Sequence, residues 1–226
     1  MKKIPLAIAI ASALLSHTAM AYDAGDILVR ARLINVVPDE SSSDLSLNGA
    51  TLADSDVQVT DNLSLDIDFT YMLSPNWGVE LLLDISSQHT VRAKGNTLRG
   101  LGVSKVGSAR VLPPSLIMQY HFLPNNPVKP YAGIGINYTH FFDEKLDNDV
   151  STGLAGSDLI LDDSWGLVGQ VGADIDIGND WFLNVDLKYI DMNSDTSFDI
   201  LNNAVGVDVD IDINPWIFGI GIGTRF

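Results

Sequence analysis

Leu63-Ser64-Leu65-Asp66-Ile67-Asp68-Phe69-Thr70-Tyr71 is the stretch of sequence that decides the fold class. Its odd-numbered positions are apolar or aromatic, whereas its even-numbered positions are serine, aspartate or threonine. A helix would mix the two sets around its surface, but a β-strand places each set on a face of its own. The stretch therefore predicts a strand with one apolar and one polar face.

The same alternation recurs along the rest of the chain. It is clear from Trp77 to Ile85 and again from Val205 to Ile213. The fold class we predict is all-β, a single antiparallel β-barrel domain of about eight strands. The predicted strands lie near residues 25–37, 62–73, 77–89, 111–123, 130–142, 163–177, 181–193 and 205–226.

The connections between the predicted strands are of two kinds. Three are short and rich in turn-forming residues, at 74–76, 123–129 and 178–180. The others are longer and polar, near 38–61, 90–110, 143–162 and 194–204. Short and long connections alternate, as they do in transmembrane barrels with short periplasmic turns at one end and long extracellular loops at the other.

Alternation alone does not tell a soluble barrel, with its apolar face inside, from a transmembrane barrel, with its apolar face toward lipid. Charged residues near mid-strand, which can pair across a narrow lumen, favour the transmembrane barrel, and so does the terminal aromatic residue Phe226, which resembles the assembly signal of bacterial outer-membrane proteins. Aromatic residues near strand ends also suit two interfacial girdles. They are Trp77, Tyr120, Phe122, Tyr131, Phe141, Phe142, Trp165, Trp181, Tyr189 and Trp216.

The first residues predict export from the cytoplasm. Met1-Lys2-Lys3 is a short positive start, an apolar run follows, and Ala19-Met20-Ala21 is a small-x-small cleavage site. This order is typical of a secretory signal peptide. We therefore predict a cleaved signal at 1–21 and a mature outer-membrane barrel at 22–226.

Composition excludes several classes of function. The chain has a formal net charge of −16 at pH 7, which argues against a nucleic-acid partner, because phosphates are bound by lysine and arginine. It has no cysteine, so a disulfide framework and a thiolate metal site are both excluded. His89, His121 and His140 fall on different predicted strands without ligand spacing, and no nucleophile motif surrounds a serine. We expect no cofactor, no metal and no enzymatic activity.

The last predicted strand has one irregularity. Its apolar residues occupy odd positions through Ile213 and even positions from Trp216 onward. We predict a β-bulge at Asn214-Pro215 that keeps both halves facing lipid and accommodates a proline that cannot donate to the ladder.

Several segments resemble the OmpW family of outer-membrane proteins, in an order and spacing that cover nearly all of residues 22–226. Asn214 departs from the family pattern, because an acid commonly precedes Pro-Trp there, and Lys188 faces the lumen where an aromatic residue is expected. The segments that carry the resemblance are Leu65 to Met72, Asn76 to Leu82, Leu112 to Leu116, Lys129 to Thr139, Asp163 to Gly166, Gly169 to Gly172, Asn214 to Trp216 and Arg225-Phe226.

The resemblance implies a narrow, partly apolar channel that is open to the outside and blocked toward the periplasm. It also implies passage of small hydrophobic molecules, with lateral release through the barrel wall into the membrane, since related alkane-import proteins belong to the same group. The competing hypothesis is a barrel that transports nothing and serves as a structural protein or as a surface receptor for phage or bacteriocins.

The polar faces of the predicted strands also carry apolar residues. We predict that these line the lumen, although side chains that simply fill a closed barrel would give the same pattern. Arg30, Arg32, Glu80 and Lys188 are the charged groups that we predict to pair and plug it, because unpaired buried charges are costly. The predicted apolar lining is Ile34, Val36, Met72, Leu82, Ile117, Phe141, Val168 and Ile190.

Pro113-Pro114 interrupts a predicted strand, because neither proline can donate to the ladder. One hypothesis is that the break forms a lateral opening in the wall. The alternative is that it marks the outer end of the strand above the membrane.

The expected partners follow from the predicted location. They are outer-membrane lipid and lipopolysaccharide, the barrel assembly machinery that reads Phe226, and a small hydrophobic solute; we expect a monomer. The predicted external loops are acidic, which fits either solvated loops or loops that share divalent cations with lipopolysaccharide phosphates.

Overall fold

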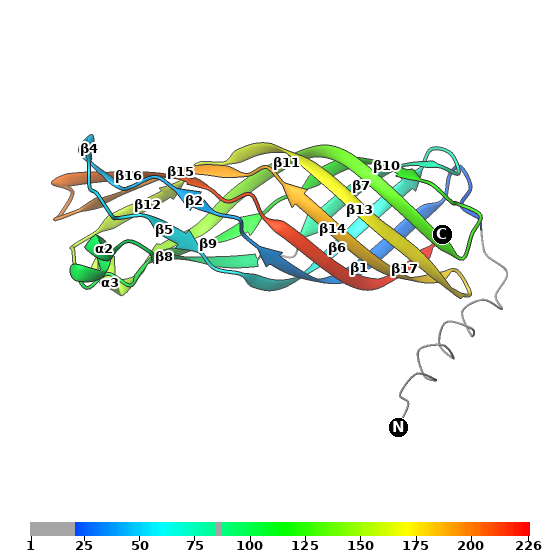
Figure 1. Cartoon of the computed structure of the whole chain (residues 1–226), viewed down its shortest axis with the longest axis horizontal. Coiled ribbons are helices and arrows are strands. Elements are labelled where there is room, and N and C mark those ends of the chain that lie inside the picture. The colour runs from blue at the N-terminus through cyan, green and yellow to red at the C-terminus, as the bar shows by residue number, and fades with distance from the viewer. Residues whose placement is uncertain (1–20, 85–86) are drawn as a thin grey trace, which may run out of the picture.

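The computed structural model describes residues 21–84 and 87–226. The predicted signal peptide therefore lies outside the described residues except for Ala21. The molecule is a long cylinder of strands (Figure 1). Both the short turns and the C-terminus lie at one end, which we call the turn end, and two short helices lie at the other.

Antiparallel strands close into a barrel next to the turn end. Going around the ring, each strand is hydrogen-bonded to the next, and the last returns to the first. In ring order the strands are β1 (Ile27–Val37), β6 (Asn62–Met72), β7 (Trp77–Asp84), β10 (Ser115–His121), β11 (Val128–Leu146), β13 (Ser164–Gly178), β14 (Trp181–Ile190) and β17 (Trp216–Arg225). The predicted eight-stranded antiparallel barrel is confirmed.

Two further sheets continue the cylinder beyond the barrel. One joins the end of β11 to β9 (Lys105–Leu112), β8 (Ser87–Ala93) and β5 (Val57–Val59). The other contains β12 (Ser157–Leu161), β15 (Asn193–Ile200), β16 (Val205–Asp212), β2 (Ser41–Ser42), β3 (Ser46–Leu47) and β4 (Ala50–Thr51). Helices α2 (Asn96–Gly100) and α3 (Asn148–Ser151) lie at the far end. We call residues 38–61, 87–112, 140–161 and 193–213 the extension.

The extension corrects the prediction of long polar loops. The segment 194–204, for example, is largely strand β15, which pairs with β16 from Asn193↔Asp212 to Ile200↔Val205. These segments have outward polar residues, which gave them the composition of loops, but their inward positions are mostly apolar and pack into one core. They form sheets because burying that apolar face stabilises them. In the described part of the chain, no helix is long and apolar enough to cross a membrane.

The outer surface of the barrel is an apolar band. Leu65, Phe69 and Leu81 are exposed on it, while Asp66, Asp68 and Glu80 between them are buried inside. Aromatic pairs border the band, with Trp77–Tyr120 centroids 4.9 Å apart near the turn end and Tyr138–Trp165 and Tyr189–Trp216 pairs 4.8 and 5.0 Å apart near the extension. This outside-apolar arrangement with two girdles is that of a membrane wall.

Two of the predicted girdle residues lie elsewhere. Tyr131 and Phe141 are both buried inside the cylinder, at 2% and 4% exposure. They occupy inward positions on β11, and an inward position excludes a residue from the outer girdle whatever its chemistry.

The β16–β17 junction corrects the predicted bulge. The predicted break is present, because β16 ends at Asp212, β17 begins at Trp216 and Asn214 has a φ of 40°. However, Val209, Ile211 and Ile213 point into the extension, and Ile217 beyond the break is buried as well. Odd positions therefore face inward on both sides of the break. What changes at the break is which face is apolar: the apolar residues face outward in the barrel and inward in the extension.

Candidate functional site: an apolar interior above an ionic plug

Arg30 forms the centre of a charged network inside the barrel. It points inward from β1, and its Nε and Nη2 donate to the two carboxylate oxygens of Asp174 at 3.0 and 2.8 Å. Its Nη1 donates to Asp68 and to the Thr70 hydroxyl, both at 2.8 Å. The bidentate contact and the complete burial of Arg30 make this a rigid crosslink between β1, β6 and β13.

Arg32 repeats this arrangement one inward position further along β1. Its Nε and Nη2 donate to both oxygens of Asp66 at 2.8 and 2.9 Å, and Nη2 lies 2.8 Å from Asp68. Opposite, Lys188 pairs with Asp186 and lies 4.0 Å from Glu80. The charges alternate in sign across the lumen, so that each buried ion faces an opposite charge.

Neutral polar groups satisfy the remaining carboxylate oxygens. Gln119 donates to Glu80 at 2.5 Å, and Gln170 donates to Glu80 at 3.2 Å and to Asp186 at 2.8 Å. The hydroxyls of Tyr22 and Tyr131 donate to Asp174 and Asp186 at 2.8 and 2.9 Å. The result is a layer of mutually satisfied ions that fills the barrel, and we call it the plug.

All four predicted plug residues lie in this layer. That the layer blocks passage through the barrel stays a prediction. Tyr131, Gln119 and Gln170 were missed because their side chains carry no charge. Their inward parity on β11, β10 and β13 was the signal that could have found them. Lys188, which departs from the family pattern, ends in the plug beside Asp186 and does not line the apolar space above it.

Above the plug the interior is apolar. Six of the eight predicted lining residues belong to one continuous apolar cluster that runs into the extension: Ile34, Val36, Ile117, Phe141, Val168 and Ile190. Leu82 is also buried, at 3% exposure. Met72 is buried on the other side of the plug, with Tyr22, Leu28 and Phe182 near the turn end. Alternation shows which residues point inward but not their height along the barrel, and this is why Met72 was misplaced.

Three cavities follow one another inside this apolar cluster. The lower cavity, on the extension side of the plug, has a volume of about 50 Å³, and Val36, Phe141 and Ile190 are in its wall. The middle cavity shares Ala109, Thr196 and Ile211 with the lower one. The tip cavity, beside α2 and α3, shares Leu45, Val106 and Phe198 with the middle one.

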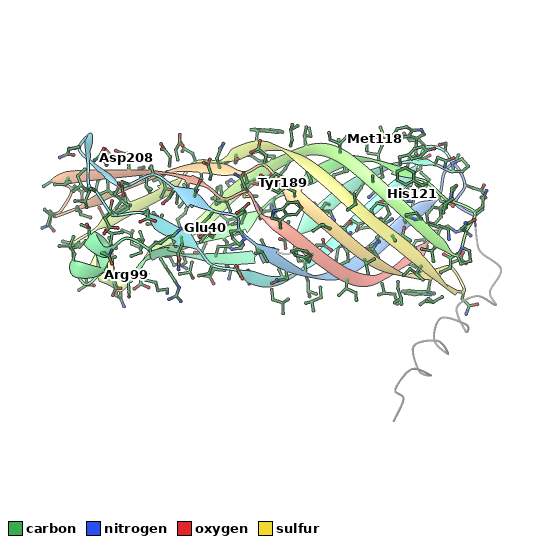
Figure 2. The ribbon with its side chains drawn as sticks, in the orientation of Figure 1. Glu40, Arg99, Met118, His121, Tyr189 and Asp208 are labelled. Atoms are coloured by element: carbon green, nitrogen blue, oxygen red, sulfur yellow. The ribbon has the colours of Figure 1, made fainter. Side chains whose placement is uncertain are left out.

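Much of the cavity wall was not predicted as lining. Val111, Met192, Ile211 and Ile213 all line the lower cavity. The odd positions of 205–213 were predicted to face lipid. Alternation is the same whether the apolar face of a strand points outward, as in the barrel, or inward, as in the extension. The view with side chains shows the division of the molecule: Tyr189 lies near the middle of the long axis, Met118 on the barrel, and Arg99 and Asp208 on the extension (Figure 2).

The proline pair lies at the wall of the lower cavity. Pro113 is buried and lines that cavity, between the end of β9 and the start of β10. Toward β11 its carbonyl and that of Pro114 accept hydrogen bonds from the Asn137 side chain at 3.1 and 3.3 Å, and Tyr138 N donates to Pro114 O at 3.0 Å. On the opposite side, the ladder to β7 ends at Ser115↔Leu82 and the ladder to β8 begins at Val111↔Ser87.

The break is therefore hydrogen-bonded on its β11 side, and on its other side the facing strand runs into residues 85–86, which lie outside the described residues. Because Pro114 bonds to Tyr138, whose ring packs on Trp165, the break lies at the level of the girdle nearest the extension. Both hypotheses for the proline pair, a lateral opening and the outer end of the strand above the membrane, stay predictions.

Phe226 closes the barrel at the turn end. Its N–H donates to Ile27 O and its carbonyl accepts from Ile27 N, each at 2.9 Å, while its ring is exposed. No group of three or more histidine, aspartate or glutamate side chains in the described residues is placed to hold a metal ion.

Comparison with known proteins identifies this architecture. The family model described as "OmpW family" matches residues 23–226. The chain belongs to the OmpW family. It is 37% identical over 227 residues to outer membrane protein W of Vibrio cholerae serotype O1, with 100% of both chains covered. The crystal structure of the outer membrane protein OprG from Pseudomonas aeruginosa superposes with a TM-score of 0.85 at 35% identity, covering 91% of this chain and 98% of OprG.

A further relative is named after a metabolic operon. It is the dibenzothiophene metabolism operon protein PahQ of Pseudomonas aeruginosa, 30% identical over 197 residues and covering 87% of each chain. As a member of the OmpW family, the protein is an integral β-barrel of the Gram-negative outer membrane. The turn end is then periplasmic, and the extension is extracellular.

Proposed function

We propose that the protein admits small hydrophobic molecules across the outer membrane, through the apolar interior of the extension and then sideways into the lipid. The observation that carries this proposal is the series of three apolar cavities that begins at the extracellular tip and ends in the upper part of the barrel, above the plug. Transfer of a hydrophobic solute from water into such a space is favourable by about 25 cal/mol for each Å² of apolar surface buried.

The plug supports a lateral route. Arg30, Arg32 and Glu80 are completely or almost completely buried, so an apolar solute that continued toward the periplasm would separate paired ions in a medium of low dielectric. Pro113, which has no N–H to donate to a ladder, lines the same lower cavity at the level of the outer girdle. The path of lowest cost from this cavity therefore leads through the wall.

The relatives agree with this choice of solute. The name of PahQ refers to an operon for dibenzothiophene metabolism, and dibenzothiophene is an apolar aromatic molecule. We extend to this chain only the chemical class, a small hydrophobic molecule.

Uptake of a labelled alkane by intact cells tests the proposal. A strain without the protein is compared with strains that express the wild type, Ile211→Asp or Asp210→Asn. Ile211 lines the lower and middle cavities, whereas Asp210 beside it is exposed on the outer face of β16. A carboxylate in the cavity should abolish protein-dependent uptake, because it brings water and charge into the path, and Asp210→Asn should leave uptake unchanged.

The lateral step has its own test. Replacing Pro113 and Pro114 by alanine restores two backbone donors in the wall of the lower cavity. We expect slower uptake at a normal level of folded protein, and unchanged uptake would remove the lateral opening from the proposal.

The alternative is a structural or receptor barrel that transports nothing, which the layer of buried ion pairs across the lumen favours. It predicts that the strain without the protein accumulates the alkane at the parental rate. The lipopolysaccharide contact, the assembly machinery that reads Phe226 and the monomeric state stay predictions.

A further inference from the structure

One polar side chain in the cavity walls has no hydrogen-bond partner. The lower and middle cavities are lined by apolar residues and by five polar ones, Asp84, His89, Ser108, Ser194 and Thr196. Within the described residues, Thr196 Oγ1 is buried and makes no hydrogen bond.

Each of the other four polar side chains makes a hydrogen bond. Asp84 accepts from the Ser64 hydroxyl at 3.1 Å, and His89 Nδ1 lies 3.1 Å from Thr60 O. Ser108 Oγ accepts from Gln88 at 3.3 Å, and Ser194 Oγ donates to Asp162 O at 3.0 Å. These contacts tie the four side chains to the wall, whereas the buried Thr196 hydroxyl has no hydrogen bond at all.

Thr196 lies between two of the cavities on the proposed path. It points inward from β15 at 5% exposure, opposite Val209 on one neighbour and Leu161 on the other. It is one of the residues shared by the lower and middle cavities, so it lines the passage between them. A single rotation about its Cα–Cβ bond moves Oγ1 to another staggered position, which turns the hydroxyl without moving the strand.

A buried hydroxyl without a partner is unfavourable, and a ligand that supplies the partner recovers that free energy. We propose that Thr196 binds the polar end of the solute, so that the protein prefers hydrophobic molecules that carry one hydroxyl or carbonyl group over pure hydrocarbons. This inference rests on the proposed function and names the substrate class within it.

Paired probes of equal chain length test the preference. The probes are radiolabelled n-dodecane and 1-dodecanol, and the quantity compared is the ratio of their protein-dependent uptake rates, after subtraction of uptake by a strain without the protein. The wild type should favour the alcohol by roughly fivefold, the ratio that corresponds to the net ~1 kcal/mol of one hydrogen bond.

Thr196→Val removes the hydroxyl and keeps the shape of the side chain. It should bring the ratio close to one, because the alcohol then loses its hydrogen-bond partner in the cavity wall. Thr196→Ser retains the hydroxyl and should retain the preference. Ser194→Ala is the matched control, because the Ser194 hydroxyl already donates to Asp162 O and its loss should not change the ratio.

The outcomes separate this inference from the function on which it rests. A ratio that is the same in wild type and Thr196→Val, with protein-dependent uptake of both probes, overturns the role of Thr196 alone. If neither probe shows protein-dependent uptake, the transport proposal fails, and the inference fails with it.

Discussion

Arg30 shows at the scale of one residue what holds the plug together. It is fully buried, and two carboxylates from different strands share its guanidinium. Removing one member of such a group leaves the other charges buried without a partner, which costs more than the pair itself contributes. An exposed pair lacks this penalty, because water solvates the remaining charge.

Arg30→Met should therefore lower the free energy of unfolding by about 3–5 kcal/mol. Arg110→Met is the control, because Arg110 lies 3.6 Å from Asp143 in an exposed pair on the extension, and its loss should cost about 0–1 kcal/mol. Urea unfolding of the barrel in lipid vesicles measures both values. Equal losses in the two variants would mean that the plug does not stabilise the barrel.

Individual residues also show what sequence could predict about the site. The inward position of Arg30, Arg32, Glu80 and Lys188 followed from alternation, because parity is set locally by the pleat of a strand. Their partners did not follow, because Arg30 and Asp174, for example, are separated by 144 positions and meet only when the barrel closes. Charge indicates that a residue needs a partner, but strand register decides which partner it has.

At the scale of the element, β16 and β17 show a limit of alternation as a signal. Val209 and Ile211 on β16 point inward, whereas Phe218 and Ile220 on β17 point outward, and both strands alternate equally well. A strand covered by water needs an apolar inner face, and a strand covered by lipid needs an apolar outer face. The existence and position of the strands were thus predictable, but the position of the membrane edge along them was not.

Asp149 joins a helix to a strand in the extension, outside the membrane. Its carboxylate accepts hydrogen bonds from the Ser104 hydroxyl, Ser104 N and Lys105 N at 2.7, 2.9 and 3.1 Å, which joins α3 to the start of β9. These hydrogen bonds hold the pKa of Asp149 below its ordinary value. A carboxyl with a lowered pKa stabilises the folded state above its ordinary pKa, and this contribution is lost as the pH falls through the lowered pKa.

Asp149→Asn should therefore speed hydrogen exchange of the Ser104 and Lys105 amides at neutral pH. The ratio of variant to wild-type exchange rates should approach one once the pH is below the lowered pKa of Asp149, because wild-type Asp149 is then neutral as well. Taking the ratio at each pH cancels the intrinsic pH dependence of exchange. Asp208→Asn, on the exposed outer face of β16, is the control and should leave these amides unchanged. A ratio that is constant with pH would contradict the role of the carboxylate.

At the scale of the whole molecule, the cylinder consists of two parts with opposite polarity. The barrel is apolar outside and ionic inside, and the extension is polar outside and apolar inside. The two interiors meet between the lower cavity and the plug, close to the girdle of Tyr189 and Trp216. The path that we propose for a hydrophobic molecule would therefore keep it in apolar surroundings from the extracellular tip to the level of the outer leaflet.

The location of a bound apolar molecule tests this account most directly. Crystals of the protein grown with 1-bromododecane, with diffraction measured at the bromine absorption edge, reveal each bromine by its anomalous signal. We predict anomalous density inside the lower cavity, between Val111 and Ile211. Density confined to the outer face of the barrel, beside Phe218 and Ile220, would contradict an apolar path through the interior.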